Sequence, residues 1–152
     1  MKIQYERIIP AERIKITPRP VWKCRSCEFF GKNPSCPPYV PSWQDTREFV
    51  KNYKKALLIK FQVNMKEFEK MKKEILLYLL KKERELLSEY PYAYAVFPGA
   101  CNLCEVCEFE KFGRCPTPQK VRPSLDALGI EITSIVKINF NESVLYSLIF
   151  LD

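Results

Sequence analysis

Residues 56–63 read ALLIKFQV, and this mostly apolar run predicts a buried β-strand. A long helical pattern follows, in which Asn64 is a suitable N-cap residue and Glu67 completes a capping box. Pro91 ends that pattern after about 26 residues, and residues 92–97, YAYAVF, predict a second strand. A strand, a helix and a strand in this order are typical of a β-α-β unit, so we expect the two strands to lie side by side and parallel.

Other elements are predicted on both sides of this unit. A capping box opens a short helix over residues 42–53, and a second short helix over residues 124–128 is closed by Gly129. Residues 130–140 and 144–151 predict two strands joined as a C-terminal β-hairpin. We therefore expect an α/β fold, with α+β as the alternative, built on a mixed sheet of about four or five strands with a long helix.

Length and composition are those of a globular protein. The chain has 152 residues, of which 47% are apolar and 28% charged, and we expect a single metal-binding domain over residues 1–152. The first twenty residues carry charges and prolines where a signal peptide has an apolar run. The longest apolar run, residues 75–80, is far shorter than the roughly 20 residues that span a bilayer. These features predict a cytoplasmic protein with no membrane segment.

The positive charge of the chain is concentrated in its first part. The formal net charge is +7, and residues 1–60 hold thirteen basic residues against five acidic ones. Such a basic segment could attract nucleic acid or an acidic partner protein. An ordinary solvated surface explains the same charges, so the sequence does not favour nucleic acid.

The seven cysteines are arranged as a repeat. Residues 24–38 read CRSCEFFGKNPSCPP and residues 104–118 read CEVCEFEKFGRCPTP, so both contain C-x₂-C-E-F, five or six further residues and C-P. Cys101 adds a seventh thiol three residues before the second copy, which defines two cysteine loops at residues 24–38 and 101–118. An odd number of cysteines cannot all pair, and structural disulfides are rare in the cytoplasm. We therefore expect metal ligands and not disulfides.

The second loop favours an iron–sulfur cluster. A C-x₂-C pair alone is ambiguous between zinc and redox chemistry. Cys101, Cys104 and Cys107, however, form C-x₂-C-x₂-C, and with Cys115 before a proline they resemble bacterial ferredoxin loops that hold [4Fe–4S] clusters. Seven residues separate Cys107 from Cys115, where the ferredoxin spacing is three.

Zinc is the alternative cofactor. A structural zinc ion takes four Cys or His ligands, and this chain has no histidine. One zinc site could use the two C-x₂-C pairs, namely Cys24, Cys27, Cys104 and Cys107. That arrangement leaves Cys36, Cys101 and Cys115 without a role. One or two [4Fe–4S] clusters use the seven thiols better, because three cysteines can hold a cubane whose fourth iron stays open.

The motifs also carry a family resemblance. The C-x₂-C…C-P-P-Y motif of residues 24–39 and the G-A-C-x₂-C-x₂-C…C-P…R-P-S-x₂-A-x-G-I motif of residues 99–130 resemble an uncharacterised prokaryotic family of predicted metal-binding proteins. The resemblance implies a cysteine-ligated metal centre and names neither metal nor substrate. It assigns the ligand role to Cys24, Cys27, Cys36, Cys101, Cys104, Cys107 and Cys115. Arg122, in the same motif, is expected on the surface or against a cluster sulfide.

Three classes of function fit these observations. The first is electron transfer between one or two clusters and a redox partner protein. The second is an enzyme that performs sulfur-transfer or redox chemistry on a small molecule at an open cluster iron. The chain offers no histidine and no evident acid–base pair, so the sequence does not decide whether it is an enzyme. The third is a zinc-stabilised structural or nucleic-acid-binding module.

The repeat also predicts how the ligands are divided. We expect the two loops to meet in space, because they flank one strand-helix-strand unit, with the residue 42–53 helix carrying the chain back along the sheet. In the simplest division Cys101, Cys104, Cys107 and Cys115 hold one cluster, and Cys24, Cys27 and Cys36 hold a second one with an open iron. A crossed arrangement, known from two-cluster ferredoxins, would exchange Cys36 and Cys115.

Overall fold

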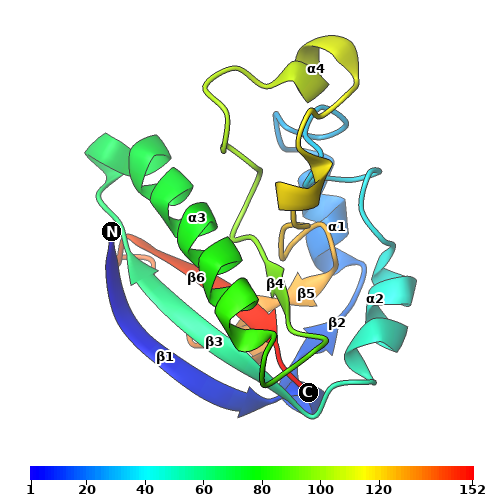
Figure 1. The fold of residues 1–152 in the computed structure, drawn as a ribbon, viewed down its shortest axis with the longest axis vertical. Helices are drawn as coiled ribbons and strands as arrows, with labels where there is room; N and C mark the ends of the chain where they lie inside the picture. The colour runs from blue at the N-terminus through cyan, green and yellow to red at the C-terminus, as the bar shows by residue number, and fades with distance from the viewer.

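The computed structural model describes all 152 residues and contains a four-stranded antiparallel sheet with the strand order β1-β3-β6-β4 (Figure 1). Its strands are β1 (Lys2–Pro10), β3 (Lys55–Gln62), β4 (Tyr94–Val96) and β6 (Val144–Phe150). A two-stranded sheet pairs β2 (Lys15–Ile16) with β5 (Ile130–Glu131). The helices are α1 (Arg19–Cys24), α2 (Trp43–Val50), α3 (Phe68–Leu86) and α4 (Glu108–Phe112). Short 3-10 helices lie at Ala11–Arg13, Met65–Glu67, Pro118–Lys120 and Ile132–Ser134.

The predicted strand-helix-strand unit is present as β3, α3 and β4, but its strands are not neighbours. β6 pairs antiparallel with β3 on one side and with β4 on the other. β3 and β4 therefore run parallel to each other with β6 between them. The expected fold of helices on a sheet of about four strands, with one long helix, is confirmed. The expectations that β3 and β4 would pair directly and that the sheet would be mixed are wrong, because β6 lies between them and makes every neighbouring pair antiparallel.

The predicted C-terminal hairpin is also wrong. Only Ile130–Glu131 is a strand within residues 130–140, and it pairs with β2. The apolar β6 instead enters the middle of the main sheet, where it buries side chains from both faces. The short helix expected over residues 124–128 is a turn that ends in the left-handed Gly129, φ +82°, where a Cβ would lie 2.5 Å from the Thr17 carbonyl oxygen.

The N-terminal strand β1 was not expected from the sequence. It is the outer strand next to β3, and most of its side chains are exposed, which explains why it carries charges along its length. The predicted helix start at Ser42 is confirmed, since its hydroxyl accepts a hydrogen bond from the Asp45 N–H at 3.1 Å. Asn64 also acts as a cap and accepts a hydrogen bond from the Lys66 N–H at 2.9 Å, but it caps the 3-10 helix Met65–Glu67 that precedes α3. The capping box expected from Glu67 is not formed, because Glu67 is itself the N-cap of α3 and its side chain makes no capping hydrogen bond. Crossing a membrane takes a longer and more apolar helix than any found here.

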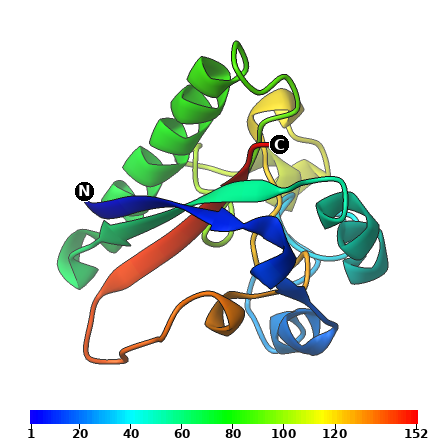
Figure 2. The ribbon, with the colours of Figure 1, turned by 90° about the horizontal axis from the view of Figure 1, so that it is seen from below.

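Two apolar cores cover the two faces of the main sheet. The long helix α3 lies on one side of this sheet (Figure 2). On one face α3 packs against β3 and β6, with Ile75, Leu76 and Leu79 fully buried. On the other face α2, β2 and β5 pack against the opposite side chains of the same strands. The long helix α3 and the two cysteine loops are therefore supported by a sheet that is covered on both faces.

A buried ion pair fastens α3 to the segment after the second cysteine loop. The Glu83 carboxylate accepts hydrogen bonds from Arg122 Nη2 at 2.6 Å, Arg122 Nε at 3.0 Å and the Ala95 N–H at 2.6 Å. Arg122 also donates to the carbonyl oxygens of Gln119 and Val121. The expectation that Arg122 would lie on the surface or face a cluster is therefore wrong, because its donors are taken by Glu83 and backbone oxygens.

Replacing Arg122 by Met is expected to lower the free energy of unfolding by about 3 kcal/mol, because it leaves the Glu83 carboxylate buried without its partner. Urea unfolding of the reduced, metal-free protein measures this. Lys81→Met is the matched control, since Lys81 and Glu85 form an exposed pair at 4.0 Å on the same helix, and we expect a change below about 0.5 kcal/mol. Equal effects of the two substitutions would contradict a structural role of the Glu83–Arg122 pair.

Candidate metal centre

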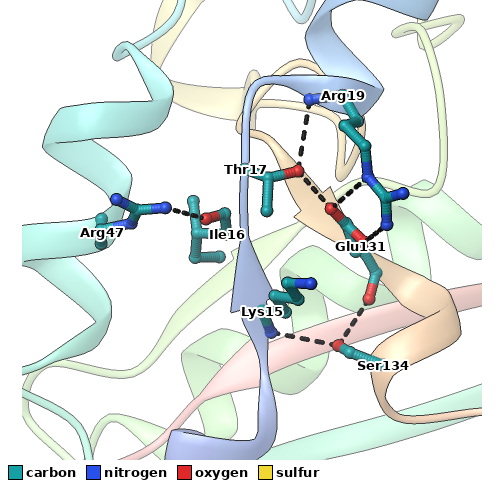
Figure 3. Close-up of polar contacts among 7 residues, drawn as sticks. All are labelled: Lys15, Ile16, Thr17, Arg19, Arg47, Glu131 and Ser134. Carbon is teal, nitrogen blue, oxygen red and sulfur yellow. Dashed lines mark hydrogen bonds and ion pairs between the residues drawn. The ribbon is translucent and has the colours of Figure 1, made fainter.

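The first cysteine loop begins at a helix that is anchored by a carboxylate (Figure 3). Glu131 of β5 accepts hydrogen bonds from the Thr17 hydroxyl and from the guanidinium of Arg19, whose Nε lies at 3.0 Å. The hydrogen bonds from Arg19 and then Thr17 lower the pKa of Glu131 to about 2. Arg19 is the first residue of α1 and Cys24 is the last, so this contact fixes the helix that delivers the first thiol.

Consecutive turns bring the three thiols of the first loop together. The Cys27 N–H donates to the Cys24 carbonyl oxygen, and the Cys36 N–H donates to that of Asn33, both at 3.0 Å. Burial raises the pKa of Cys36 to about 12, and the nearby thiols of Cys24 and Cys27 add to the shift. Burial, followed by the charge of Asp126 and by Cys27, raises the pKa of Cys24 to about 11. Cys27 is exposed, so the group reaches from the interior to the surface.

The four thiols of the second loop line a single small cavity. Its wall consists of Cys101, Cys104, Cys107, Cys115 and seven further residues, among them Pro34, Leu103 and Phe109. Cys107 is the residue directly before α4, and Gly113 ends that helix in the left-handed conformation. Burial raises the pKa of Cys101. A backbone hydrogen bond with Leu103 lowers this pKa, and the neighbouring thiols of Cys104, Cys115 and Cys107 raise it further, in that order. These four cysteines are the set expected for one cluster.

The two loops meet, as expected, through the side chain of Asn33. Its Nδ2 donates to the Cys101 carbonyl oxygen at 2.9 Å, and its Oδ1 accepts from the Cys101 N–H at 3.1 Å. The same Oδ1 accepts from the Ser35 N–H at 3.0 Å, so the amide joins the first loop to a backbone position of the second. The rings of Tyr39 and Phe109 add an edge-to-face contact at 4.7 Å. As expected, α2 leads the chain from this junction back to the start of β3 (Figure 1).

The donor set, seven cysteines in a chain without histidine, suits a thiolate-bound metal centre. No three of the Cys, Asp and Glu side chains lie in position to hold a single ion. A second feature of the loops fits a centre with sulfur at its surface: the Ser35 hydroxyl, directly before Cys36, is fully buried and has no hydrogen-bond partner. Hydroxyl donors commonly hydrogen-bond metal-bound sulfur, so an unpaired buried O–H at this position is consistent with such a centre.

Sequence reasoning missed the residues that hold the loops together. Asn33 and Ser35 lie in the variable stretch between C-x₂-C and C-P, where nothing in the residue pattern distinguishes them from surface residues. Lys72 was missed for another reason. It lies on the buried face of α3 with Ile75 and Leu79. The helical period places it on this face, but its charge is typical of an exposed residue.

Asn33→Ala is expected to lower the free energy of unfolding by about 2 kcal/mol, because it leaves the Ser35 N–H and both Cys101 backbone groups without partners. Urea unfolding of the reduced, metal-free protein gives this value. The matched control is Asn52→Ala, since Asn52 is exposed and its amide makes one hydrogen bond, to the Glu48 carbonyl oxygen. An Asn33→Ala variant as stable as the control would show that the loops are held together by other contacts.

The chain was compared with known proteins by sequence and by structure. No curated protein and no solved structure matches it. A family model described as "Predicted metal-binding protein (DUF2284)" matches residues 7–145, which include both cysteine loops and most of the main sheet. The family resemblance carried by the cysteine motifs is thereby confirmed, and the chain belongs to this family of predicted metal-binding proteins.

Proposed function

We propose that this protein is an iron–sulfur protein that binds one or two [4Fe–4S] clusters through its seven cysteines. The observation that carries the proposal is the single cavity lined by Cys101, Cys104, Cys107 and Cys115 in a chain that has no histidine. Four cysteines around one cavity supply the number of thiolates that a cubane cluster requires. The neighbouring first loop supplies the remaining three thiols, Cys24, Cys27 and Cys36.

The grouping of the thiols supports iron–sulfur over zinc. The zinc alternative requires Cys24, Cys27, Cys104 and Cys107 to share one ion. In the structure the first two of these lie near Cys36, and the last two share a cavity with Cys101 and Cys115. Cys101 also acts on the charge of Cys36, so the two groups of thiols are neighbours. A zinc-stabilised structural or nucleic-acid-binding module remains the second function, supported by the basic first sixty residues.

The two groups of thiols would have different chemistry. A bound [4Fe–4S] cluster supplies one-electron redox chemistry and, where only three thiolates hold it, an iron that is open to a small ligand. The second loop, with four cysteines, suits electron transfer to a partner protein. The first loop, with three, suits binding of a small molecule, and sulfur-transfer or redox catalysis is the enzyme class that follows from it. Thiols in these numbers suit the reducing cytoplasm.

Protein purified from its native host without oxygen is expected to contain iron and acid-labile sulfide in equal amounts, with four or eight of each per chain, as one or two [4Fe–4S] clusters require. Iron, sulfide and zinc are measured per chain, and the absorption near about 400 nm is recorded. Re-exposure of a sample to air is the control, since oxidation should bleach this absorption. Stoichiometric zinc without sulfide would overturn the proposal in favour of the zinc-stabilised module.

The division of ligands predicts which substitution removes which cluster. Cys104→Ala is expected to abolish the cluster of the second loop and to spare that of the first, and Cys27→Ala is expected to do the reverse. The two residues are a matched pair, because both are exposed and belong to a C-x₂-C motif, so their effects on folding should be similar. Electron paramagnetic resonance of the reduced proteins distinguishes the two clusters. The same single spectrum from both variants would contradict two separate sites.

Cys36→Ala and Cys115→Ala then distinguish the direct from the crossed arrangement. In the direct arrangement Cys36→Ala affects the same cluster as Cys27→Ala. In the crossed arrangement it affects the same cluster as Cys104→Ala, because the cysteine before proline would ligate the other site. The three-thiolate cluster should be the first to lose iron in air, and its spectrum should change when cyanide is added.

A further inference from the structure

A lysine is buried where the two cysteine loops meet. Lys72 lies on the inner face of α3, one turn from Ile75 and Leu76, and only 6% of its surface is exposed. Lysines are almost never this buried unless an acidic partner neutralises them. Lys72 takes part in none of the ion pairs of the structure, although the chain has eighteen acidic residues. The fold therefore buries this lysine without a carboxylate within ion-pairing distance.

The ammonium group lies against both loops. A methyl group on Gly99 would lie 3.5 Å from Lys72 Nζ, and Gly99 is two residues before Cys101. On the other side, Nζ lies 6.0 Å from the ring centroid of Phe29, which is two residues after Cys27. The ammonium group thus lies between the backbone that leads into the second loop and an aromatic ring of the first.

The charges that act on Lys72 are mostly thiols. Burial lowers the pKa of this lysine, and four groups oppose the shift, in the order Glu69, Cys101, Cys36 and Cys27. Glu69 lies one turn earlier on the exposed side of α3, and its carboxylate accepts a hydrogen bond from Asn102. The other three groups come from the two cysteine loops, so the lysine interacts with thiols of both proposed sites.

A cluster site gives this charge a role. Four thiolates around a [4Fe–4S] core of charge 2+ leave a net charge of about −2, three leave about −1, and each one-electron reduction adds another negative charge. Negative charge in a poorly solvated site needs compensation, and a cation a few ångströms away stabilises the reduced state more than the oxidised one.

We propose that Lys72 is the shared counter-ion of the two cysteine sites, a positioning charge that retains the metal in both loops and raises the reduction potential of both clusters. The effect on the reduction potential rests on the proposed iron–sulfur function. The effect on metal retention holds for any thiolate-bound metal, because the negative charge comes from the cysteines. Lys72 itself ligates nothing in this proposal.

Lys72→Met tests the proposal, because it keeps an unbranched side chain of nearly the same length and removes its charge. In the cluster-loaded protein, the potentials of both clusters should shift to more negative values in a redox titration followed by electron paramagnetic resonance. Iron release to a chelator should be faster by on the order of tenfold, as expected for the loss of a unit charge near the site. The cluster-free protein should instead become more resistant to urea, because an unpaired buried charge is replaced by an apolar side chain.

Two further variants serve as controls. Lys70→Met removes the same charge from an exposed position of the same helix and should change none of the three measurements. Lys72→Arg keeps the charge, and its clusters should retain potentials close to those of the unchanged protein. If Lys72→Met leaves both potentials and the rate of iron release equal to those of Lys70→Met, or alters only one cluster, the shared counter-ion is refuted.

The failure of the proposed function can be told from the failure of this inference. If the unchanged protein carries zinc and no sulfide, the iron–sulfur proposal fails, and the same variants are compared by zinc release to a chelator. Faster zinc release from Lys72→Met than from Lys70→Met then supports Lys72 as the counter-ion of a zinc-thiolate centre. Equal rates refute it.

Discussion

The pairing of β3 with β6 is the contact on which the rest of the structure depends. Seven consecutive residues of each strand are in register, from Ala56 opposite Phe150 to Gln62 opposite Val144. Because side chains alternate along a strand, this register sends Leu57, Ile59 and Phe61 toward α3 and the residues between them toward α2. A shift by one residue would exchange the two cores. The pair also sets the distance between β3 and β4, since β6 fills the place between them.

The positions of the two cysteine loops depend on this sheet, because the elements next to each loop belong to it or pack against it. β4 leads directly into the second cysteine loop, and α2 leads out of the first, so the sheet decides where both loops stand. The loops contact each other through the Asn33 amide, through the rings of Tyr39 and Phe109, and through Pro34, which lines the cavity of the second loop. The buried thiols are costly to ionise in the absence of a metal, as the raised pKa values of Cys24 and Cys36 show. A metal must therefore displace protons from these thiols when it binds.

Local sequence patterns predicted the elements better than their arrangement. The caps at Ser42 and Asn64, the strand β3 and the long helix α3 follow from residues that are close together in the chain, so the sequence alone was sufficient to find them. The position of β6 depends on pairing with strands some fifty to ninety residues away, which no local pattern records. β1 escaped notice because an edge strand needs little apolar character.

The same division applies to the candidate site. The cysteine repeat predicted two groups of thiols and assigned Cys101 to the second loop, and in the structure Cys101 lines a cavity with Cys104, Cys107 and Cys115. Asn33 could not be found in this way, since its hydrogen bonds cross sixty-eight positions of the chain. Arg122 was misread because it stands in a cysteine motif, while its partner Glu83 lies on a different element. Lys72 and Glu83 are charged residues on the otherwise apolar face of α3, and this pattern in the sequence indicates that both side chains are buried.

The place of β6 has a consequence for how the protein is made. This strand follows all seven cysteines in the chain, yet it lies between β3 and β4, which precede it. Both cysteine loops are therefore synthesised before the strand that fixes the spacing of their supports. Until β6 has left the ribosome and inserted between β3 and β4, the sheet that supports the two cysteine loops is incomplete. During that time the thiols are as accessible to metals and oxidants as those of an unfolded chain. The frame that holds both cysteine loops is thus complete only after β6 has been synthesised.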